Sequence, residues 1–197
     1  MTEQVSRLAV SDEELVREAR TGSSASIDEL WRRYQRRIFL FIRRKVGTDQ
    51  DAEDILQDTF IKAMRYLDRF DEKYRFSGWL FTICNQLIIS HYRRRKEVEL
   101  PQEIPNCSDG PAETAETDSL KERLWKAASR LPKKQFDVIW LRYVENMTVA
   151  EVARCMSISG INTRVLLHRA RLALMREVSE VETVEEGARA NMIEVTS

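Results

Sequence analysis

The sequence lacks the features that would place it in a membrane, a disulfide scaffold or a metalloprotein. No run approaches the roughly 20 apolar residues of a membrane span, and the polar start of the chain has no signal-peptide core. The three cysteines are far apart without a C-x-x-C pair, so neither a disulfide framework nor a zinc site is predicted. With two histidines and no cluster of metal-ligand residues, we expect no metal, no cofactor and a cytoplasmic protein without a membrane span.

The chain also lacks a net charge, because 32 basic residues balance 32 acidic ones. These charges are unevenly distributed along the sequence. Residues 12–96 carry a net charge of +4, 97–119 of −7, 120–178 of +7 and 179–197 of −4. Basic segments concentrate nucleic acid near a protein surface and make its binding dependent on salt. The charge pattern therefore favours nucleic acid as the partner of the two basic segments.

The chain contains no convincing strand, whereas apolar residues recur at helical spacing through both basic segments. Between them, the stretch 97–117 contains three of the four prolines and no basic residue, which is typical of a linker. We therefore predict an all-α fold of two small helical domains, at 12–96 and 118–178. A flexible acidic linker joins them, and an acidic tail follows at 179–197.

The segment 148–171 predicts a helix-turn-helix in the second domain. Thr148 and Glu151 have the spacing of a capping box at the start of the first helix, and Ser159 can cap the second. The second helix is predicted to bury Thr163, Leu167, Ala170 and Leu174 and to expose Arg164, His168, Arg169 and Arg171. Such a helix enters the major groove, where cations donate to guanine edges or phosphates. An ordinary helical hairpin with a solvated basic face is the alternative.

A helix predicted to begin near Asp51 has two stripes. Its inner stripe is apolar, while the second, outward stripe consists of Glu53, Gln57, Phe60 and Met64, with Asp54 and Asp58 beside it. Apolar anchors ringed by carboxylates suit docking to a basic partner. Packing of Phe60 beneath a neighbouring loop explains the pattern equally well.

Aromatic and cationic side chains alternate between residues 69 and 81. In proteins that bind single-stranded nucleic acid, rings stack on bases and cations follow the phosphates. Most of these rings fit a core equally well, and Tyr74 and Phe76 are the better candidates for base contact. The next helix, with Ser77 as its predicted cap, ends in the four cations of 93–96.

Five stretches of the chain resemble a bacterial sigma factor of the extracytoplasmic-function (ECF) group of the sigma-70 family. They are DAEDILQDTF at 51–60, FSGWLFTI at 76–83, HYRRRK at 91–96, Leu131-Pro132 and VLLHRARLAL at 165–174. The resemblance implies two helical domains that bind RNA polymerase core and promoter DNA, without catalytic activity. The first domain would separate the DNA strands at the minus-ten element and read that element as single strand. The second domain would read the minus-thirty-five element as duplex. An anti-sigma factor is a further expected partner.

The resemblance also implies site residues. The core-polymerase surface would consist of Asp54, Gln57, Asp58, Phe60 and Met64. Contacts to the minus-ten element would come from Lys73, Tyr74, Arg75, Phe76, Asn85, Gln86, Arg93 and Arg94. Contacts to the minus-thirty-five element would come from Arg164, Val165, His168, Arg169 and Arg171. The chain departs from the family where Gln86 and Ser90 replace a frequent Asn and Asp, and where Leu166 replaces a phosphate-contacting Arg; Asn85 is a neighbouring substitute for the Asn.

Two rival functions follow from the same residues. A helix-turn-helix repressor or activator would bind a palindromic site without polymerase, and its docking stripe would then be a self-contact. An enzyme acting on nucleic acid is disfavoured, because both histidines lie in basic helices and the carboxylates of 51–58 have no partnered base.

Overall fold

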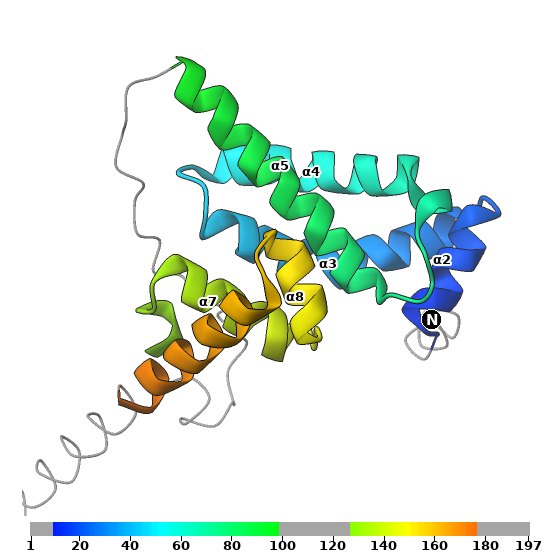
Figure 1. Cartoon of the computed structure of the whole chain (residues 1–197). Helices are drawn as coiled ribbons and strands as arrows, with labels where there is room; N and C mark the ends of the chain where they lie inside the picture. The colour runs from blue at the N-terminus through cyan, green and yellow to red at the C-terminus, as the bar shows by residue number, and fades with distance from the viewer. Residues whose placement is uncertain (1–9, 99–126, 177–197) are drawn as a thin grey trace, which may run out of the picture. The chain divides into compact units, whose positions relative to one another are not determined.

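The computed structural model describes residues 10–98 and 127–176, and these residues form helices and loops without a strand (Figure 1). The predicted all-α fold is confirmed. The predicted linker and acidic tail fall almost entirely outside the described residues. None of the described helices has the length and apolar character needed to cross a membrane.

Contacts divide the chain into two compact units. The first contains α2 (Asp12–Arg20), α3 (Ser24–Arg43), α4 (Asp49–Arg65), the 3-10 turn η1 (Leu67–Arg69), α5 (Phe76–Val98) and α8 (Val149–Met156). The second contains α7 (Lys133–Ile139), the π-helical turn η2 (Trp140–Val144) and a helix over residues 160–176.

Side-chain caps define the starts of the first three helices. Ser11, Ser23 and Thr48 each accept a hydrogen bond from the backbone N–H three residues further on, at 3.1 to 3.3 Å. These bonds satisfy donors that have no partner within the helix. In contrast, α5 begins at Phe76, so Ser77 lies in its first turn and the predicted Ser77 cap is wrong.

Aromatic contacts among α3, α4 and α5 form the core of the first unit. The ring of Phe41 lies 5.2 Å from that of Phe81, and the ring of Tyr34 lies 5.6 Å from that of Phe76, both edge to face. Such contacts add to the free energy gained from burying the rings. Cys84 is also fully buried, where it packs as a small apolar residue.

A network of charged side chains joins α3 to α2, with Arg33 bound both to Glu29 of its own helix and to Asp12 of α2. The Glu29 carboxylate accepts hydrogen bonds from Arg32 at 2.7 Å and from Arg33 at 2.8 Å, and Arg33 also donates to Asp12 at 2.8 Å. The bonds from Arg32 and Arg33 lower the pKa of Glu29 from 4.5 to about 2. The charged network therefore helps to hold the two helices together.

In the second unit α7 continues into η2, and the helix 160–176 follows α8 along the chain after a turn at residues 157–159. Ser159 caps this helix, because its Oγ accepts a hydrogen bond from the backbone N–H of Asn162 at 3.1 Å. Thr163, Leu167 and Ala170 are almost fully buried, as the spacing predicts. The opposite side of the helix is thereby left exposed.

Candidate functional site

The exposed side of α4 is acidic. Asp54, Gln57 and Asp58 are all exposed, and Ile61 lies among them with 57% of its surface accessible. Positions 54, 57, 58 and 61 share one side of a helix because of its 3.6-residue period. The result is a carboxylate-rich face, here called the α4 face, with one large apolar side chain on it.

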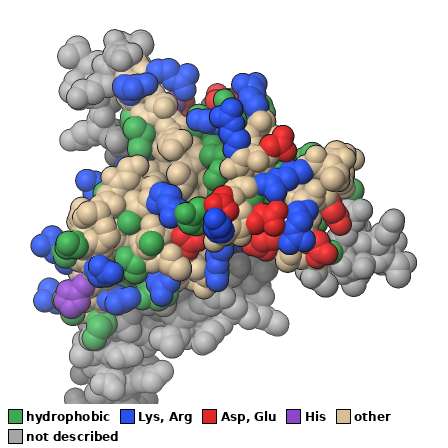
Figure 2. Space-filling view, turned by 45° about the vertical axis from the view of Figure 1, so that its right-hand side comes forward, with side chains coloured by type: hydrophobic (Ala, Val, Ile, Leu, Met, Phe, Trp, Pro, Cys, Tyr) green, Lys and Arg blue, Asp and Glu red, His purple; other side chains and the backbone are tan. Residues whose placement is uncertain are grey.

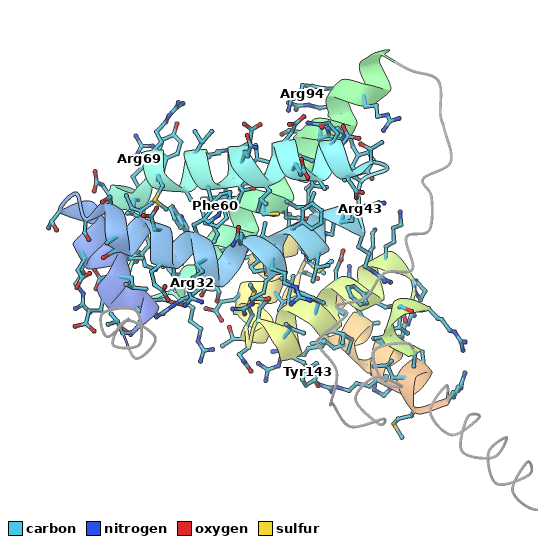
Figure 3. The ribbon with its side chains drawn as sticks, turned by 180° about the vertical axis from the view of Figure 1, so that it is seen from behind. Arg32, Arg43, Phe60, Arg69, Arg94 and Tyr143 are labelled. Carbon is cyan, nitrogen blue, oxygen red and sulfur yellow. The ribbon has the colours of Figure 1, made fainter. Side chains whose placement is uncertain are left out.

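The predicted outward position of Phe60 is wrong. Its side chain is 5% exposed and lies between α4 and α3 (Figure 3), where its ring centroid is 4.3 Å from that of Trp31. The alternative correctly expected Phe60 to be buried, but its ring packs against Trp31 of helix α3 and not beneath a loop. Met64 is half-buried. The sequence did contain a signal for the outward apolar residue. Ile61 follows Asp54 and Asp58 at helical spacing and therefore lies on the same side of the helix as these carboxylates.

The loop 71–75 between η1 and α5 is fixed by α2. Arg20 donates to the carbonyl of Leu67 at 3.2 Å and to that of Phe70, and its guanidinium lies 2.9 Å from Glu72. Arg17 contacts the same carboxylate at 3.2 Å. Sequence reasoning missed these two arginines, because residues about 50 positions apart give no local signal of a contact.

This anchored loop exposes three of the predicted minus-ten residues. Lys73, Tyr74 and Arg75 are exposed, with 42% of the Tyr74 surface accessible. A backbone hydrogen bond of 3.0 Å from Tyr74 N to Asp71 O tightens the turn. The loop thus presents one ring and two cations at the surface, which suits base stacking beside a phosphate chain, and the Arg154 guanidinium of α8 lies 4.2 Å from the centroid of that ring.

Two predicted minus-ten residues are buried instead. Phe76 is fully inaccessible, with ring contacts to Tyr34 and Phe70 at 5.6 and 5.8 Å, so the predicted base contact by Phe76 is wrong for this structure. Asn85 is 7% exposed, and its Oδ1 accepts a hydrogen bond from Lys45 Nζ at 3.1 Å. Its predicted role as a substitute DNA contact is therefore not supported by its position.

The remaining predicted minus-ten residues lie along the exposed side of α5. Gln86, Arg93 and Arg94 are exposed, and Figure 3 shows Arg94 near the end of that helix. Ser90 is half-buried. Arg95 differs from its neighbours, because it lies 3.8 Å from Asp51 of α4. This end of α5 therefore presents cations to solvent.

The helix 160–176 exposes all five predicted minus-thirty-five residues, which are Arg164, Val165, His168, Arg169 and Arg171. Leu166, at the position where the family often has Arg, is half-buried. Tyr143 of η2 contacts Arg171: its hydroxyl accepts a hydrogen bond from Arg171 Nε at 2.7 Å, and its ring lies 5.7 Å from the guanidinium. Tyr143 thereby restricts the direction of one exposed cation, a role that sequence spacing did not indicate.

No group of three or more His, Cys, Asp or Glu side chains that could hold a metal ion occurs within residues 10–98 and 127–176. The features that could bind a partner, as described above, are exposed surfaces of α4, the loop 71–75, α5 and the helix 160–176. One is acidic and the others are cationic.

Two family models match the chain. Residues 30–98 match sigma-70 region 2, and residues 121–174 match sigma-70 region 4. The first match contains the α4 face and the loop 71–75, and the second contains the helix-turn-helix.

Curated relatives cover most of the chain. It is 25% identical to the ECF RNA polymerase sigma factor SigW of Bacillus subtilis, over 84% of this chain and 96% of the relative. It is 31% identical to the ECF RNA polymerase sigma factor BldN of Streptomyces coelicolor, over 83% of this chain and 64% of the relative. It is 28% identical to the ECF RNA polymerase sigma factor SigM of Bacillus subtilis, over 76% of this chain and 93% of the relative.

Solved structures show the same fold. CnrH, solved in complex with the cytosolic domain of CnrY, is similar with a TM-score of 0.56 and 23% identity, over 86% of this chain and 97% of CnrH. The sigma factor RpoE, solved with the anti-sigma factor NepR from Bartonella quintana, is similar with a TM-score of 0.57 and 21% identity, over 77% and 96%. With both family regions matched in order and ECF relatives along most of its length, this chain belongs to the sigma-70 family, as a sigma factor of the ECF group.

Proposed function

We propose that this protein binds RNA polymerase core, directs it to specific promoters and starts transcription there, as an initiation factor rather than an enzyme. The observation that carries the assignment of roles is the separation of charge on its surface. The exposed side of α4 is acidic, whereas the loop 71–75, the end of α5 and the helix 160–176 expose cations. An acidic face is repelled by DNA and suits a protein partner, while cationic faces suit phosphates.

The α4 face is the proposed core-polymerase surface. Asp54, Gln57 and Asp58 supply its polar rim and Ile61 its apolar anchor. Half-buried Met64 lies at the border of the surface. Binding energy at a protein interface concentrates on a few residues that become desolvated, so Ile61 is expected to contribute more to core affinity than its acidic neighbours. Phe60 supports this surface from beneath.

The proposed minus-ten contacts are Lys73, Tyr74 and Arg75 in the loop and Gln86, Arg93 and Arg94 on α5. Melting exposes unstacked bases, and a ring fixed in the anchored loop can stack on one of them. The proposed minus-thirty-five contacts are five of the exposed residues of the helix 160–176, namely Arg164, Val165, His168, Arg169 and Arg171. Assignment of these two tasks to domains at 12–96 and 118–178 remains a prediction.

When one polymerase carries both weak DNA-binding surfaces, binding of the first surface to a promoter raises the effective concentration of the second surface at that promoter. We therefore expect the free protein to bind promoter DNA poorly compared with the polymerase-bound form. We also propose an anti-sigma factor as a partner, because solved relatives are described in such complexes. A helix-turn-helix regulator that acts without polymerase is not favoured, since the family regions of a sigma factor both match.

Run-off transcription tests this proposal. Purified core polymerase is supplied with this protein and a pool of promoter fragments from the source genome. Specific transcripts that appear only with the protein, and that weaken with Gln57→Ala or Ile61→Ala, are expected. An absence of transcripts together with core-independent binding to a palindromic duplex would instead indicate a repressor or activator.

A further inference from the structure

The exposed side of the helix 160–176 is apolar along its middle. Ile161 is 74% exposed, Val165 40%, Leu172 42% and Met175 65%. Positions 161, 165, 172 and 175 lie on one line along a helix, as does His168. Figure 2 shows one face of the molecule on which apolar and cationic side chains lie together around a histidine. Exposed apolar residues in a row on an otherwise charged surface mark a contact surface.

Arginines flank this apolar line on both sides. Arg164 and Arg171 lie on one flank, at three and ten residues after Ile161, and Arg169 and Arg176 lie on the other. All four are exposed. A face with an uncharged middle and cationic edges matches the major groove, whose floor consists of base edges and whose two rims consist of phosphates.

The floor of the major groove has one apolar group, the C5 methyl of thymine. We propose that Ile161 and Val165 recognise thymine methyl groups, so that the duplex element read by this protein contains thymines in neighbouring base pairs at the start of the helix 160–176. This inference rests on the proposed function. It adds Ile161 to the residues that determine specificity, and it assigns to Val165 an apolar contact with a thymine methyl group.

The start of the helix is the part that reaches base edges in a helix-turn-helix. Ile161 and Val165 occupy its first two turns, and the Ser159 cap fixes the backbone there. Met175 lies about 21 Å further along the axis than Ile161, at a rise of about 1.5 Å per residue. Only the first two apolar residues are therefore expected to contact bases.

Replacing thymine by deoxyuridine tests this inference, because it removes only the methyl group. The preferred minus-thirty-five sequence is first selected from random duplexes with polymerase bound to this protein. Each thymine is then replaced in turn, and the affinity of the same holoenzyme is measured. At one or two positions, the substitution should lower the affinity of the holoenzyme for the duplex about fourfold, which is the effect of losing one buried methyl group.

Protein variants connect each position to a residue. With Ile161→Ala or Val165→Ala, the deoxyuridine effect should fall below about twofold at one position and remain at the other. Met175→Ala removes an exposed apolar side chain from the far end of the same face and should leave both effects unchanged. Thermal unfolding of each variant establishes that it is folded, and the deoxyuridine series on the unaltered protein is independent of that condition.

The outcomes separate this inference from the proposed function. Sequence-selective binding without any deoxyuridine effect would overturn the methyl recognition and leave the sigma-factor function intact. A failure of promoter-specific transcription would overturn the function itself. If the alanine variants left DNA affinity unchanged but weakened binding of an acidic amphipathic helix, the apolar line would be a protein-docking surface and the inference would be wrong.

Discussion

Replacing Phe60 and replacing Gln57 should both weaken transcription, Phe60 by destabilising its domain and Gln57 by weakening the contact with polymerase core. Phe60 is 5% exposed and contacts the Trp31 ring at 4.3 Å. Truncating a buried Phe to Ala typically costs about 3–5 kcal/mol. Because small domains are stable by only about 5–15 kcal/mol, Phe60→Ala should remove a large share of the stability of its domain.

The corresponding shift in melting temperature is large. One kcal/mol moves the midpoint of a domain of about 60–100 residues by about 4–8 °C, so Phe60→Ala should lower it by at least about 12 °C. Gln57 is exposed, and surface substitutions change stability by about 0.5 kcal/mol or less. Gln57→Ala should therefore melt within about 4 °C of the unaltered protein while binding polymerase core more weakly.

Two measurements distinguish the cases. Circular dichroism gives the melting midpoint, and titration of labelled protein with core polymerase gives the affinity at a temperature where every variant is folded. Phe60→Leu keeps most of the buried volume and is the matched control, with near-normal core affinity expected. A Phe60→Ala protein that melted normally yet failed to bind core would refute the reasoning and restore Phe60 to the docking surface.

Three further predictions follow from ion pairs and hydrogen bonds. Because the pKa of Glu29 is about 2 when folded and near 4.5 when unfolded, its stabilisation is present above about pH 4.5 and is lost as the pH falls towards 2. Glu29→Gln should remove about 1–2 kcal/mol at pH 7, a value reduced for the solvent around Arg32, and flatten the acid limb of urea unfolding midpoints. Arg20→Ala should lower transcription from duplex promoters about tenfold, through about 1–2 kcal/mol of lost loop anchoring, and should affect a pre-melted template less. Tyr143→Phe should weaken minus-thirty-five binding about two- to fivefold in fluorescence anisotropy, because Arg171 loses its acceptor; an unchanged affinity would show that this bond does not position the cation.

The sequence predicted the Ser159 cap at the start of the helix 160–176, and helical periodicity predicted the buried side of that helix. Thr163, Leu167 and Ala170 are buried as their spacing requires. Periodicity failed where two stripes on one helix compete, because it cannot indicate which stripe meets a neighbouring helix. On α4, that choice depends on Trp31, which lies on another helix and fills the space beside Phe60.

The loop 71–75 shows a second limit of sequence reasoning. An alternation of aromatic and cationic residues predicts a nucleic-acid contact but does not separate rings that bind bases from rings that form the core. The structure separates them, with Tyr74 exposed and Phe76 fully buried. Burial of Phe76 depends on Tyr34 and Phe70, and only the tertiary fold brings those rings to it.

Some arginines of this chain form internal contacts and others are exposed for contact with DNA. The dependence of promoter affinity on ionic strength should distinguish the two groups. Arg20 holds the loop 71–75 to α2 through a carboxylate at 2.9 Å, and Arg33 holds α3 to α2 through one at 2.8 Å, so neutralising either removes an internal contact. Arg164 and Arg169 are exposed on the helix 160–176, where a phosphate contact would release counterions. Only the exposed pair should change the slope of promoter affinity against salt, by about one unit for each cation removed. A sequence with no net charge can therefore bind DNA, because the charges that reach phosphates are not the ones that hold the fold together.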